Sequence, residues 1–355
     1  MSHPKIPLKG RGAVSNHEGR FESMARAAYD DGWTPDEETP MLKTTVQIEP
    51  CRSIIARNDS PDIGFSQSIN PYRGCEHGCV YCYARPSHSY LGLSAGLDFE
   101  TRLFAKTNAA ENLRVELSKP GYQCSAIALG SNTDPYQPVE RVYGVTRQII
   151  EVLAACEHPL TIVTKSSLVE RDIDLLAPMA QKNLAKVFVS ITSLDRKLAR
   201  TLEPRACAPQ RRLETVRNLA AAGIPVGVMV APVIPILTDS HMENILEAAR
   251  AAGAKSAGYV FLRLPHEVKD LFREWLATHA PLKAKHVMSL IRASRGGRDY
   301  DSSFGERMRG QGQFADLIED RFDKACRRLG FNQEHIPLDH GRFHPPINHP
   351  QLDLF

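Results

Sequence analysis

The chain has 355 residues, of which 42% are hydrophobic and 24% charged, and its formal net charge is +3. This length allows one large or two medium domains. The net charge is so small that it does not by itself predict a nucleic-acid partner. No run of about 18 apolar residues predicts a membrane-spanning helix, and the N-terminus lacks the apolar segment of a signal peptide. Three of the eight cysteines are clustered and nothing indicates secretion, so we expect a reduced, cytoplasmic protein.

Residues 1–60 are rich in Gly, Pro, Ser and charge, and their lack of periodicity predicts a loosely ordered N-terminal arm. From Phe65 onward, short runs rich in Val and Ile alternate with amphipathic stretches. The short runs predict strands at 65–69, 126–129, 160–163, 186–191, 226–230 and 258–262. The amphipathic stretches predict helices at 108–117, 146–155, 171–180, 210–222, 241–252 and 267–278. Gly223 and Gly253 are the expected C-terminal caps of the fourth and fifth helices.

Strands that alternate with helices predict right-handed βαβ units and a parallel sheet. Six such units over 61–282 predict an α/β fold, a partial (βα)6 TIM-like barrel, and a doubly wound open sheet is the alternative. Residues 283–342 are expected to form a basic extension with a helix at 314–329, followed by an extended tail at 343–355. Eleven Lys or Arg stand against seven Asp or Glu at 283–330. A phosphate-contacting surface or an ordinary solvated loop would explain this local excess.

The most informative motif is a run of three cysteines with the spacing Cys-x3-Cys-x2-Cys: Cys75, Cys79 and Cys82. Gly74 and Gly78 allow the backbone to fold tightly around a bound group. Thiolates are soft ligands, which suits an iron–sulfur cluster, and three of them leave one iron of a cubane open. A zinc knuckle that includes His77 is the alternative, although zinc sites usually combine two separated pairs of ligands.

This cysteine motif resembles that of the radical S-adenosylmethionine (radical SAM) superfamily. The resemblance implies that the three cysteines bind a [4Fe–4S] cluster whose open iron chelates S-adenosylmethionine. It also implies that one electron, supplied by an external donor such as flavodoxin or ferredoxin, breaks the sulfonium bond to give a 5′-deoxyadenosyl radical. A non-catalytic zinc or iron–sulfur scaffold on DNA remains a third possibility.

Shorter runs between residues 65 and 235 resemble the spore photoproduct lyase branch of that superfamily, which splits a thymine dimer. They follow in the same order along the chain, at 81–83, 131–134, 163–165, 189–191, 202–205 and 221–232. The resemblance implies a cofactor site made of Ser131, Asn132, Thr133, Asp134, Lys165, Ser190, Glu203 and Arg205. Lys165 would offer an ammonium to the cofactor's carboxylate, and Ser190 a hydroxyl to its ribose. A solvated lysine at a strand end and a structural Glu203–Arg205 ion pair are the alternatives.

One position departs from the lyase pattern, because Ser131 stands where the lyase has a hydrogen-donating cysteine. A serine O–H bond is too strong to replace a thiol as donor, so dimer splitting does not follow from the resemblance. Cys124 lies upstream, at the start of its predicted strand and so at the wrong end. Tyr81 and Tyr83, beside the cysteines, are candidate radical relays or simple packing residues.

The segment 134–140 contains two prolines that stiffen it. We therefore expect it to present Tyr136, Gln137 and Glu140 at the mouth of the barrel, where loops of such folds carry functional side chains.

The chain ends in Gln351-Leu352-Asp353-Leu354-Phe355. These residues resemble the pentapeptide by which bacterial DNA-metabolism proteins bind the DNA polymerase sliding clamp. Gln351 would supply an amide, and Leu352, Leu354 and Phe355 would be apolar anchors, while nearby prolines keep the segment extended. Docking of the tail on the protein's own body is the alternative.

Together, the motifs predict a radical SAM enzyme that acts on a damaged or modified base in DNA. Such an enzyme would flip the base out of the duplex, which is least costly for damaged bases. A radical SAM enzyme that modifies RNA, a protein or a metabolite is the main alternative.

Overall fold

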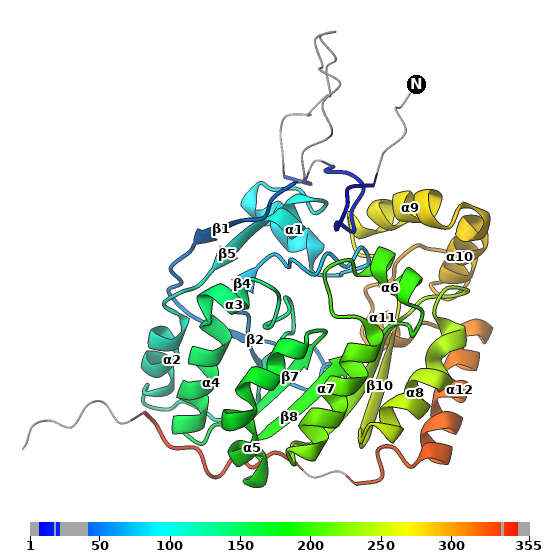
Figure 1. Ribbon diagram of the computed structural model, residues 1–355. Coiled ribbons are helices and arrows are strands. Elements are labelled where there is room, and N and C mark those ends of the chain that lie inside the picture. The colour runs from blue at the N-terminus through cyan, green and yellow to red at the C-terminus, as the bar shows by residue number, and fades with distance from the viewer. Residues whose placement is uncertain (1–6, 18, 22–41, 335–336, 347–355) are drawn as a thin grey trace, which may run out of the picture.

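The computed structural model describes residues 7–17, 19–21, 42–334 and 337–346 (Figure 1). Its main sheet contains seven strands in the order β10-β9-β8-β7-β6-β3-β2. Strand β2 pairs antiparallel with β3, and the six strands from β3 to β10 run parallel to one another. The strands are β2 Ile55–Arg57, β3 Gln67–Ile69, β6 Ile127–Leu129, β7 Leu160–Thr164, β8 Ala185–Ser190, β9 Val226–Val233 and β10 Ser256–Phe261.

The spatial order of the six parallel strands follows their order along the chain. A doubly wound sheet would reverse its order at a switch point, so that alternative is wrong and the partial (βα)6 barrel is confirmed. Helices cover one face of the sheet (Figure 1). They are α2 Ala109–Leu117, α4 Val145–Ala155, α5 Ile173–Gln181, α7 Pro209–Ala221 and α8 Met242–Ala251.

All six predicted strands and the helices between them are present, with boundaries that differ by a few residues. The strands are specified by Val and Ile side chains that the sheet buries completely, such as Val187 and Val228. Gly223 and Gly253 follow α7 and α8 with positive φ values of 77° and 106°. This conformation disfavours side chains, and it ends both helices as expected.

A second, three-stranded sheet in the order β1-β5-β4 was not predicted. Its strands are short, and β1 is mostly exposed, so they lack the apolar runs that reveal the main sheet. Strand β1 lies within the segment expected to be a loosely ordered arm. The three strands are β1 Thr45–Ile48, β4 Tyr72–Arg73 and β5 Arg102–Ala105.

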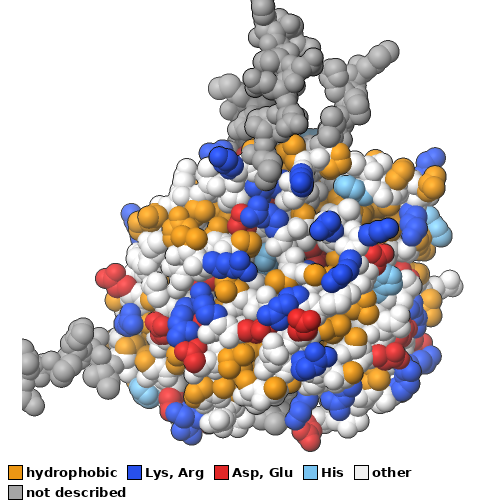
Figure 2. All heavy atoms as spheres, viewed as in Figure 1, with side chains coloured by type: hydrophobic (Ala, Val, Ile, Leu, Met, Phe, Trp, Pro, Cys, Tyr) orange, Lys and Arg blue, Asp and Glu red, His pale blue; other side chains and the backbone are white. Residues whose placement is uncertain are grey.

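The C-terminal residues pack against the barrel. The predicted helix at 314–329 is present as α12, which packs against α8 through an ion pair of 2.7 Å between Arg321 Nε and Glu243 Oε1. On the helical face, Lys and Arg side chains are interspersed with Asp and Glu (Figure 2), in keeping with the small net charge. The helices after β10 are α9 Val268–His279, α10 Pro281–Ala293, α11 Glu306–Arg309 and α12 Gln313–Leu329.

Short helical segments complete the described structure. They are η1 Arg85–Leu91, α1 Asp98–Thr101, α3 Glu140–Tyr143, η2 Ser167–Asp172, α6 Arg196–Leu202 and η3 Asp239–His241. None of the helices in the described ranges has the length and apolar character needed to cross a membrane. The four-part division of the chain remains a prediction, and the tail motif at 351–355 lies outside the described residues.

Candidate active site

The three cysteines lie in the loop after β3 and β4, at the edge where the parallel strands end. Gly74 and Gly78 within this loop have φ values of 75° and 68°. A Cβ at Gly78 would lie 2.8 Å from Glu100 Oε2, so the loop also needs glycine for close packing. In the following paragraphs we call residues 74–83 the cysteine loop.

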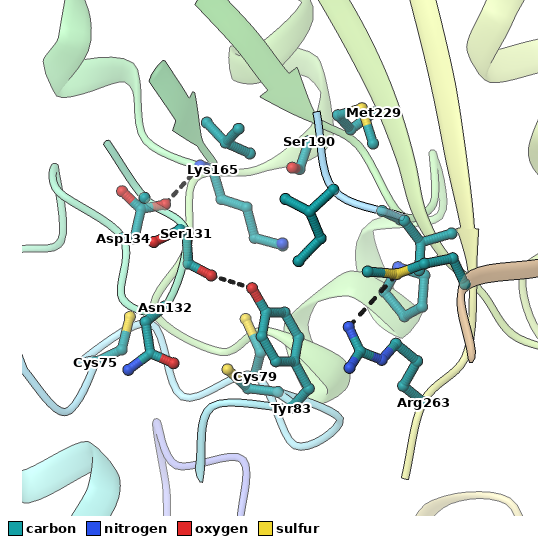
Figure 3. Close-up of a pocket in the computed structure, with 18 of the residues that line it drawn as sticks. Cys75, Cys79, Tyr83, Ser131, Asn132, Asp134, Lys165, Ser190, Met229 and Arg263 are labelled. Atoms are coloured by element: carbon teal, nitrogen blue, oxygen red, sulfur yellow. Dashed lines mark hydrogen bonds between the residues drawn. The ribbon is translucent and has the colours of Figure 1, made fainter. Parts of the chain in front are cut away.

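The cysteine loop forms one wall of a cavity of about 630 Å³ at the carboxyl ends of the strands (Figure 3). Cavities of this size commonly bind small molecules and cofactors. Cys75, Cys79 and Cys82 all line it. The predicted cofactor residues that line the same cavity are Ser131, Asn132, Asp134, Lys165 and Ser190. Thr133, Glu203 and Arg205 are not among its lining residues.

A buried ion pair supports the cysteine loop from behind. Arg85 Nη2 lies 2.5 Å from Glu100 Oε1, and both side chains are completely buried. Arg85 Nε also donates to the main-chain oxygen of Cys79 at 2.8 Å. The two Glu100 oxygens accept the N–H groups of Gly12 and Ala13 at 3.0 and 2.8 Å. An N-terminal segment is therefore part of the structure that holds the cysteine loop.

The chemistry of the three thiols fits a cluster. Burial raises the pKa of Cys75 and Cys82, and it raises that of Cys79 to about 12, so a metal must displace protons from all three. No three His, Cys, Asp or Glu side chains in the described ranges are arranged to hold a single metal ion. Three thiolates suit a cubane, in which each binds a different iron.

Asp134 connects the cysteine loop with the loops after β6 and β7. Its Oδ1 accepts a hydrogen bond from Thr164 Oγ1 at 2.7 Å, and its Oδ2 accepts one from Lys165 N at 2.7 Å. His77 Nδ1 lies 3.3 Å from the same Oδ2. Burial alone would raise the pKa of Asp134, but the charge of His77 and these hydrogen bonds lower it to about 2. The carboxylate therefore stays ionised and fixes the three loops relative to one another.

The loop after β6 is also tied to Asn70, which precedes the cysteine loop. Asn70 Oδ1 accepts the N–H groups of Asn132 and Thr133 at 2.9 and 3.2 Å. Asn70 Nδ2 lies 3.3 Å from Ser131 Oγ. Thr133 is buried, and its hydroxyl donates to the main-chain oxygen of Tyr72 at 3.0 Å. Thr133 therefore supports the cavity wall from behind, whereas Ser131 and Asn132 are part of its surface.

Lys165 and Ser190 face the cavity from the ends of β7 and β8 (Figure 3). The Lys165 ammonium lies 5.8 Å from the centre of the Tyr81 ring. Burial alone would lower the pKa of Lys165, but Cys79 and Glu203 raise it above its usual value. The structure thus places a charged ammonium inside the cavity, and not on the outer surface as the alternative interpretation of Lys165 required.

The alternative ion pair between Glu203 and Arg205 does not form. Glu203 pairs with Arg212, and both side chains are 1% exposed. Arg205 Nη2 pairs with Glu76 Oε1 at 2.7 Å. Burial alone would raise the pKa of Glu203, but the charge of Arg212 helps to lower it to about 2. Glu203 accepts a hydrogen bond from the Tyr81 hydroxyl, so it lies one side chain away from the cavity.

The two candidate relay tyrosines occupy different environments. Tyr81 is 6% exposed, and burial raises its pKa well above the usual range. Tyr83 is 44% exposed, and its hydroxyl donates to the main-chain oxygen of Ser131. The guanidinium carbon of Arg263 lies 4.8 Å from the centre of the Tyr83 ring. Tyr83 is therefore the more accessible of the two from inside the cavity.

The prediction that Tyr136, Gln137 and Glu140 face the barrel mouth is wrong, because all three are completely buried. Gln137 Nε2 donates to the main-chain oxygen of Gly74 at 3.0 Å, and its Oε1 accepts the N–H of Glu76 at 2.9 Å. The segment turns inward because its polar groups find buried partners: the Tyr136 hydroxyl donates to Asp172, and Glu140 accepts from Tyr72 and Arg171. Through Gln137 the segment also holds the cysteine loop in place.

Sequence reasoning missed the side of the cavity farthest from the motifs. This side combines the loop between β2 and β3 with the C-terminal extension, and it is tied by a 2.6 Å bond between Arg307 Nε and Asp62 Oδ2. No local pattern pairs residues so distant in sequence. Only the basic character of 283–330 gave a general signal. The missed lining residues include Asn58, Ile63, Phe65, Arg263, Arg307 and Met308.

Comparison with known proteins places this site in a family. A family model for the radical SAM superfamily matches residues 69–249, slightly more than half of the chain. Uncharacterised proteins of Mycobacterium tuberculosis and Mycobacterium bovis are 41% identical over 247 residues, covering 68% of this chain and 72% of theirs. A radical SAM Nα-GlyT isomerase of Pseudomonas phage M6 is 31% identical over 198 residues, covering 53% of this chain and 38% of the phage protein.

Solved structures of spore photoproduct lyase have a similar fold. A variant with bound AdoMet and dinucleoside spore photoproduct aligns with a TM-score of 0.59 and 16% identity, over 81% of this chain and 80% of the lyase. A second lyase variant gives the same TM-score with 17% identity. At such low identity the likeness is one of fold.

Proposed function

Because this chain belongs to the radical SAM superfamily and is a radical SAM enzyme, we propose that it acts on a damaged or modified base in DNA. Members of this superfamily use a [4Fe–4S] cluster and S-adenosylmethionine. The observation that carries the proposal is the cavity, where three thiols share one space with Phe65, Tyr83 and Arg263. Aromatic side chains and arginine together suit a base and its phosphate. The lyase with a similar fold, solved with a dinucleoside photoproduct, supports the same substrate class.

In this proposal Cys75, Cys79 and Cys82 hold the cluster, and the loops after β6, β7 and β8 hold S-adenosylmethionine. When bound, these cofactors supply a 5′-deoxyadenosyl radical that removes a hydrogen atom from the substrate. The fit rests on three soft thiols along one wall and on a cavity next to them that is large enough for a nucleoside-sized cofactor.

The chain's own residues would bind and orient that cofactor. The Lys165 ammonium suits the cofactor's carboxylate, and the Ser190 hydroxyl at the end of β8 suits a ribose hydroxyl. Both Asp134 oxygens are occupied by neighbouring loops, so we assign this carboxylate a positioning role, with Ser131 and Asn132 as the surface it holds.

Thr133, Glu203 and Arg205 would act through other residues, because they lie behind the cavity wall. Both tyrosine hydroxyls are hydrogen-bonded, Tyr81 to Glu203 and Tyr83 to the main-chain oxygen of Ser131. The two differ in exposure, because Tyr83 is 44% exposed and Tyr81 only 6%. We therefore favour Tyr83 over Tyr81 as a relay to the substrate.

A second candidate reaction is an isomerisation. The motivating observation is Ser131, which lines the cavity where the lyase resemblance calls for a thiol donor. An isomerisation returns the abstracted hydrogen atom to the rearranged substrate, so it needs no separate thiol. The phage relative, named as a radical SAM isomerase, supports this alternative.

The test is an anaerobic incubation of cluster-loaded protein with reductant, S-adenosylmethionine and an ultraviolet-irradiated oligonucleotide, followed by mass analysis of the nucleosides. We expect 5′-deoxyadenosine together with the loss of one damaged nucleoside. An isomerisation would instead give a product of unchanged mass and altered retention. The matched control is Cys79→Ala, which should form neither. If RNA or a peptide is altered under the same conditions while DNA is not, the DNA assignment is wrong.

The C-terminal motif suggests how the enzyme is kept near DNA. We propose that Gln351, Leu352, Leu354 and Phe355 bind the DNA polymerase sliding clamp and thereby keep the enzyme near DNA. Buried apolar anchors contribute roughly 1.5–3 kcal/mol each before ordering costs, so we expect an affinity of about micromolar. A peptide covering 344–355 should bind purified clamp, and one with Leu354→Ala and Phe355→Ala should not. A wild-type peptide without titratable binding would refute the clamp interaction and leave the radical chemistry unaffected.

The reaction also needs an external electron donor, such as flavodoxin or ferredoxin, which we expect in the cytoplasm. Helix α6 contacts the cysteine loop, because Val80 N donates to the main-chain oxygen of Leu202 at 3.1 Å. Arg196, Lys197 and Arg200 on this helix are exposed. This surface would suit an acidic donor protein.

A further inference from the structure

Arg263 occupies an unusual position in the cavity wall. It follows β10 by two residues, so it lies at the carboxyl edge of the last parallel strand. Its side chain lines the cavity beside Tyr83, with its guanidinium carbon 4.8 Å from the centre of the tyrosine ring (Figure 3). Arg263 therefore lines the same cavity as the three thiols. It follows the edge strand β10, whereas the cysteine loop follows β3, near the other edge of the main sheet.

The guanidinium of Arg263 has only weak partners. Nη1 lies 3.5 Å from Met308 Sδ, and Nη2 lies 3.5 Å from the Tyr300 hydroxyl. Nε is buried and has no hydrogen-bond partner. Within the part of the chain that the structure describes, no carboxylate forms an ion pair with Arg263. Arginine carries five N–H donors and a permanent charge, and leaving them unsatisfied in a buried site is costly.

The other cations of the cavity are compensated. Arg307 is held by both oxygens of Asp62. Lys165 lies in the field of Glu203 and Asp134, which contribute to its raised pKa. Among these three cations, Arg263 is thus the one without an acidic partner, and it could bind an anionic ligand.

Its neighbourhood supports the same conclusion. Arg295 is completely buried next to it and donates to the main-chain oxygens of Leu262 and Glu306 at 2.9 and 2.6 Å. Burial, with the charge of Arg263, lowers the pKa of Arg295 to about 10. Arg295 thus bonds the main chain beside Arg263, and of the two arginines Arg263 is the one that faces the cavity.

We propose that Arg263 binds a phosphodiester of the nucleic-acid substrate and so places the adjoining base beside the thiol wall. This inference rests on the proposed function and names the group by which the substrate is held. Arginine presents paired donors that match two phosphate oxygens. A phosphodiester fits better than a peptide carboxylate, because Phe65 and Tyr83 line the same cavity and offer aromatic surface suited to bases.

The test measures binding to the full-length, cluster-loaded protein, without turnover. A fluorescein-labelled ten-residue thymidine oligonucleotide is displaced by thymidylyl-thymidine or by its uncharged methylphosphonate analogue. Wild type should prefer the charged dinucleotide about tenfold or more, as expected for a charge-assisted bidentate contact. Arg263→Gln should remove this preference, and Arg263→Lys should restore part of it. The matched control is Arg309→Gln, which removes an arginine that stacks on Tyr259 outside the cavity.

The outcomes separate this inference from the proposed function. If wild type binds the oligonucleotide and Arg263→Gln keeps the charge preference, Arg263 is not the phosphate site and the DNA assignment stands. If wild type binds no oligonucleotide, both fail. If an acidic dipeptide displaces the probe better than the dinucleotide, and does so only with Arg263 present, the anion is a carboxylate and the nucleotide assignment is overturned. Circular dichroism should show that both Arg263 variants are folded, and Arg309→Gln should also match wild type in thermal unfolding and in S-adenosylmethionine cleavage without substrate.

Discussion

The two sides of the cavity differ in how their charges are satisfied. On the side of the cysteine loop, the buried acids Glu100, Asp134 and Glu203 each have a basic partner. On the other side, formed by 58–65, Arg307 and Met308 with Arg263, an ion pair joins Asp62 to Arg307, and Arg263 has no ion pair among the described residues. After the ligands that we propose for them, we call these the cofactor side and the substrate side.

This difference corresponds to the ligand that we propose for each side. Buried ion pairs cost desolvation energy but fix side chains in one arrangement, which suits a cofactor that is the same in every turnover. An arginine without a partner is costly in the free protein, and binding of an anion removes that cost. The cofactor side is thus already organised, and the substrate side is completed by its ligand.

The largest effect is expected on the cofactor side, from replacement of any one of Cys75, Cys79 and Cys82 by alanine. Each variant should lose the bound cluster and with it all reductive cleavage of S-adenosylmethionine, because two thiolates cannot replace three. Iron analysis after anaerobic reconstitution should give about four iron atoms per chain for wild type. Cys124→Ala, outside the cavity, is the control and should retain both iron and activity. Stoichiometric zinc without iron in the wild type would contradict the assignment.

A smaller effect is expected from Glu203→Gln, which leaves the Arg212 guanidinium buried without a counter-charge. Breaking a buried pair in this way typically lowers the free energy of unfolding by about 3–5 kcal/mol. Denaturant unfolding measures the change. Glu214→Gln, at a side chain that is 56% exposed on α7, should change stability by less than about 0.5 kcal/mol. Equal stabilities of the two variants would show that the cofactor side does not depend on this pair.

The smallest effect is expected on the substrate side, from Asp62→Asn. The hydrogen bond from Arg307 lowers the pKa of Asp62, so the pair stabilises the folded protein above the usual aspartate pKa of 3.8. That contribution is lost as the pH falls through the lowered pKa. We expect a loss of about 1 kcal/mol at neutral pH, disappearing below about pH 4. A difference between variant and wild type that persists in acid would assign the effect to packing.

The sequence predicted the cofactor side well, because its information is local. The three cysteines lie within eight residues, and short motifs follow successive strands, so the expected barrel brings Asp134, Lys165 and Ser190 to one edge. What local reasoning could not supply was pairing over long distances. Glu203 has a neighbour at Arg205 but pairs with Arg212, since the helix that carries Arg212 returns beneath the cavity.

The substrate side was not predictable for the same reason. Asp62 and Arg307 are separated by nearly the whole barrel, and Arg263 follows an ordinary strand with no motif around it. For the segment with Tyr136 and Gln137 the prediction was wrong in the opposite way. Its prolines and polar side chains suggested a functional surface, but the structure buries both residues. Gln137 instead satisfies the main chain of the cysteine loop, and the Tyr136 hydroxyl donates to Asp172 Oδ2 at 3.0 Å.

The account's central claim is that the thiol side generates a radical and the Arg263 side presents a DNA base to it. The most direct measurement is anaerobic incubation of cluster-loaded protein with reductant, S-adenosylmethionine and a uniformly deuterated, ultraviolet-irradiated oligonucleotide. Mass analysis of the 5′-deoxyadenosine should show deuterium transferred from the DNA. Formation of 5′-deoxyadenosine without any deuterium would contradict the claim.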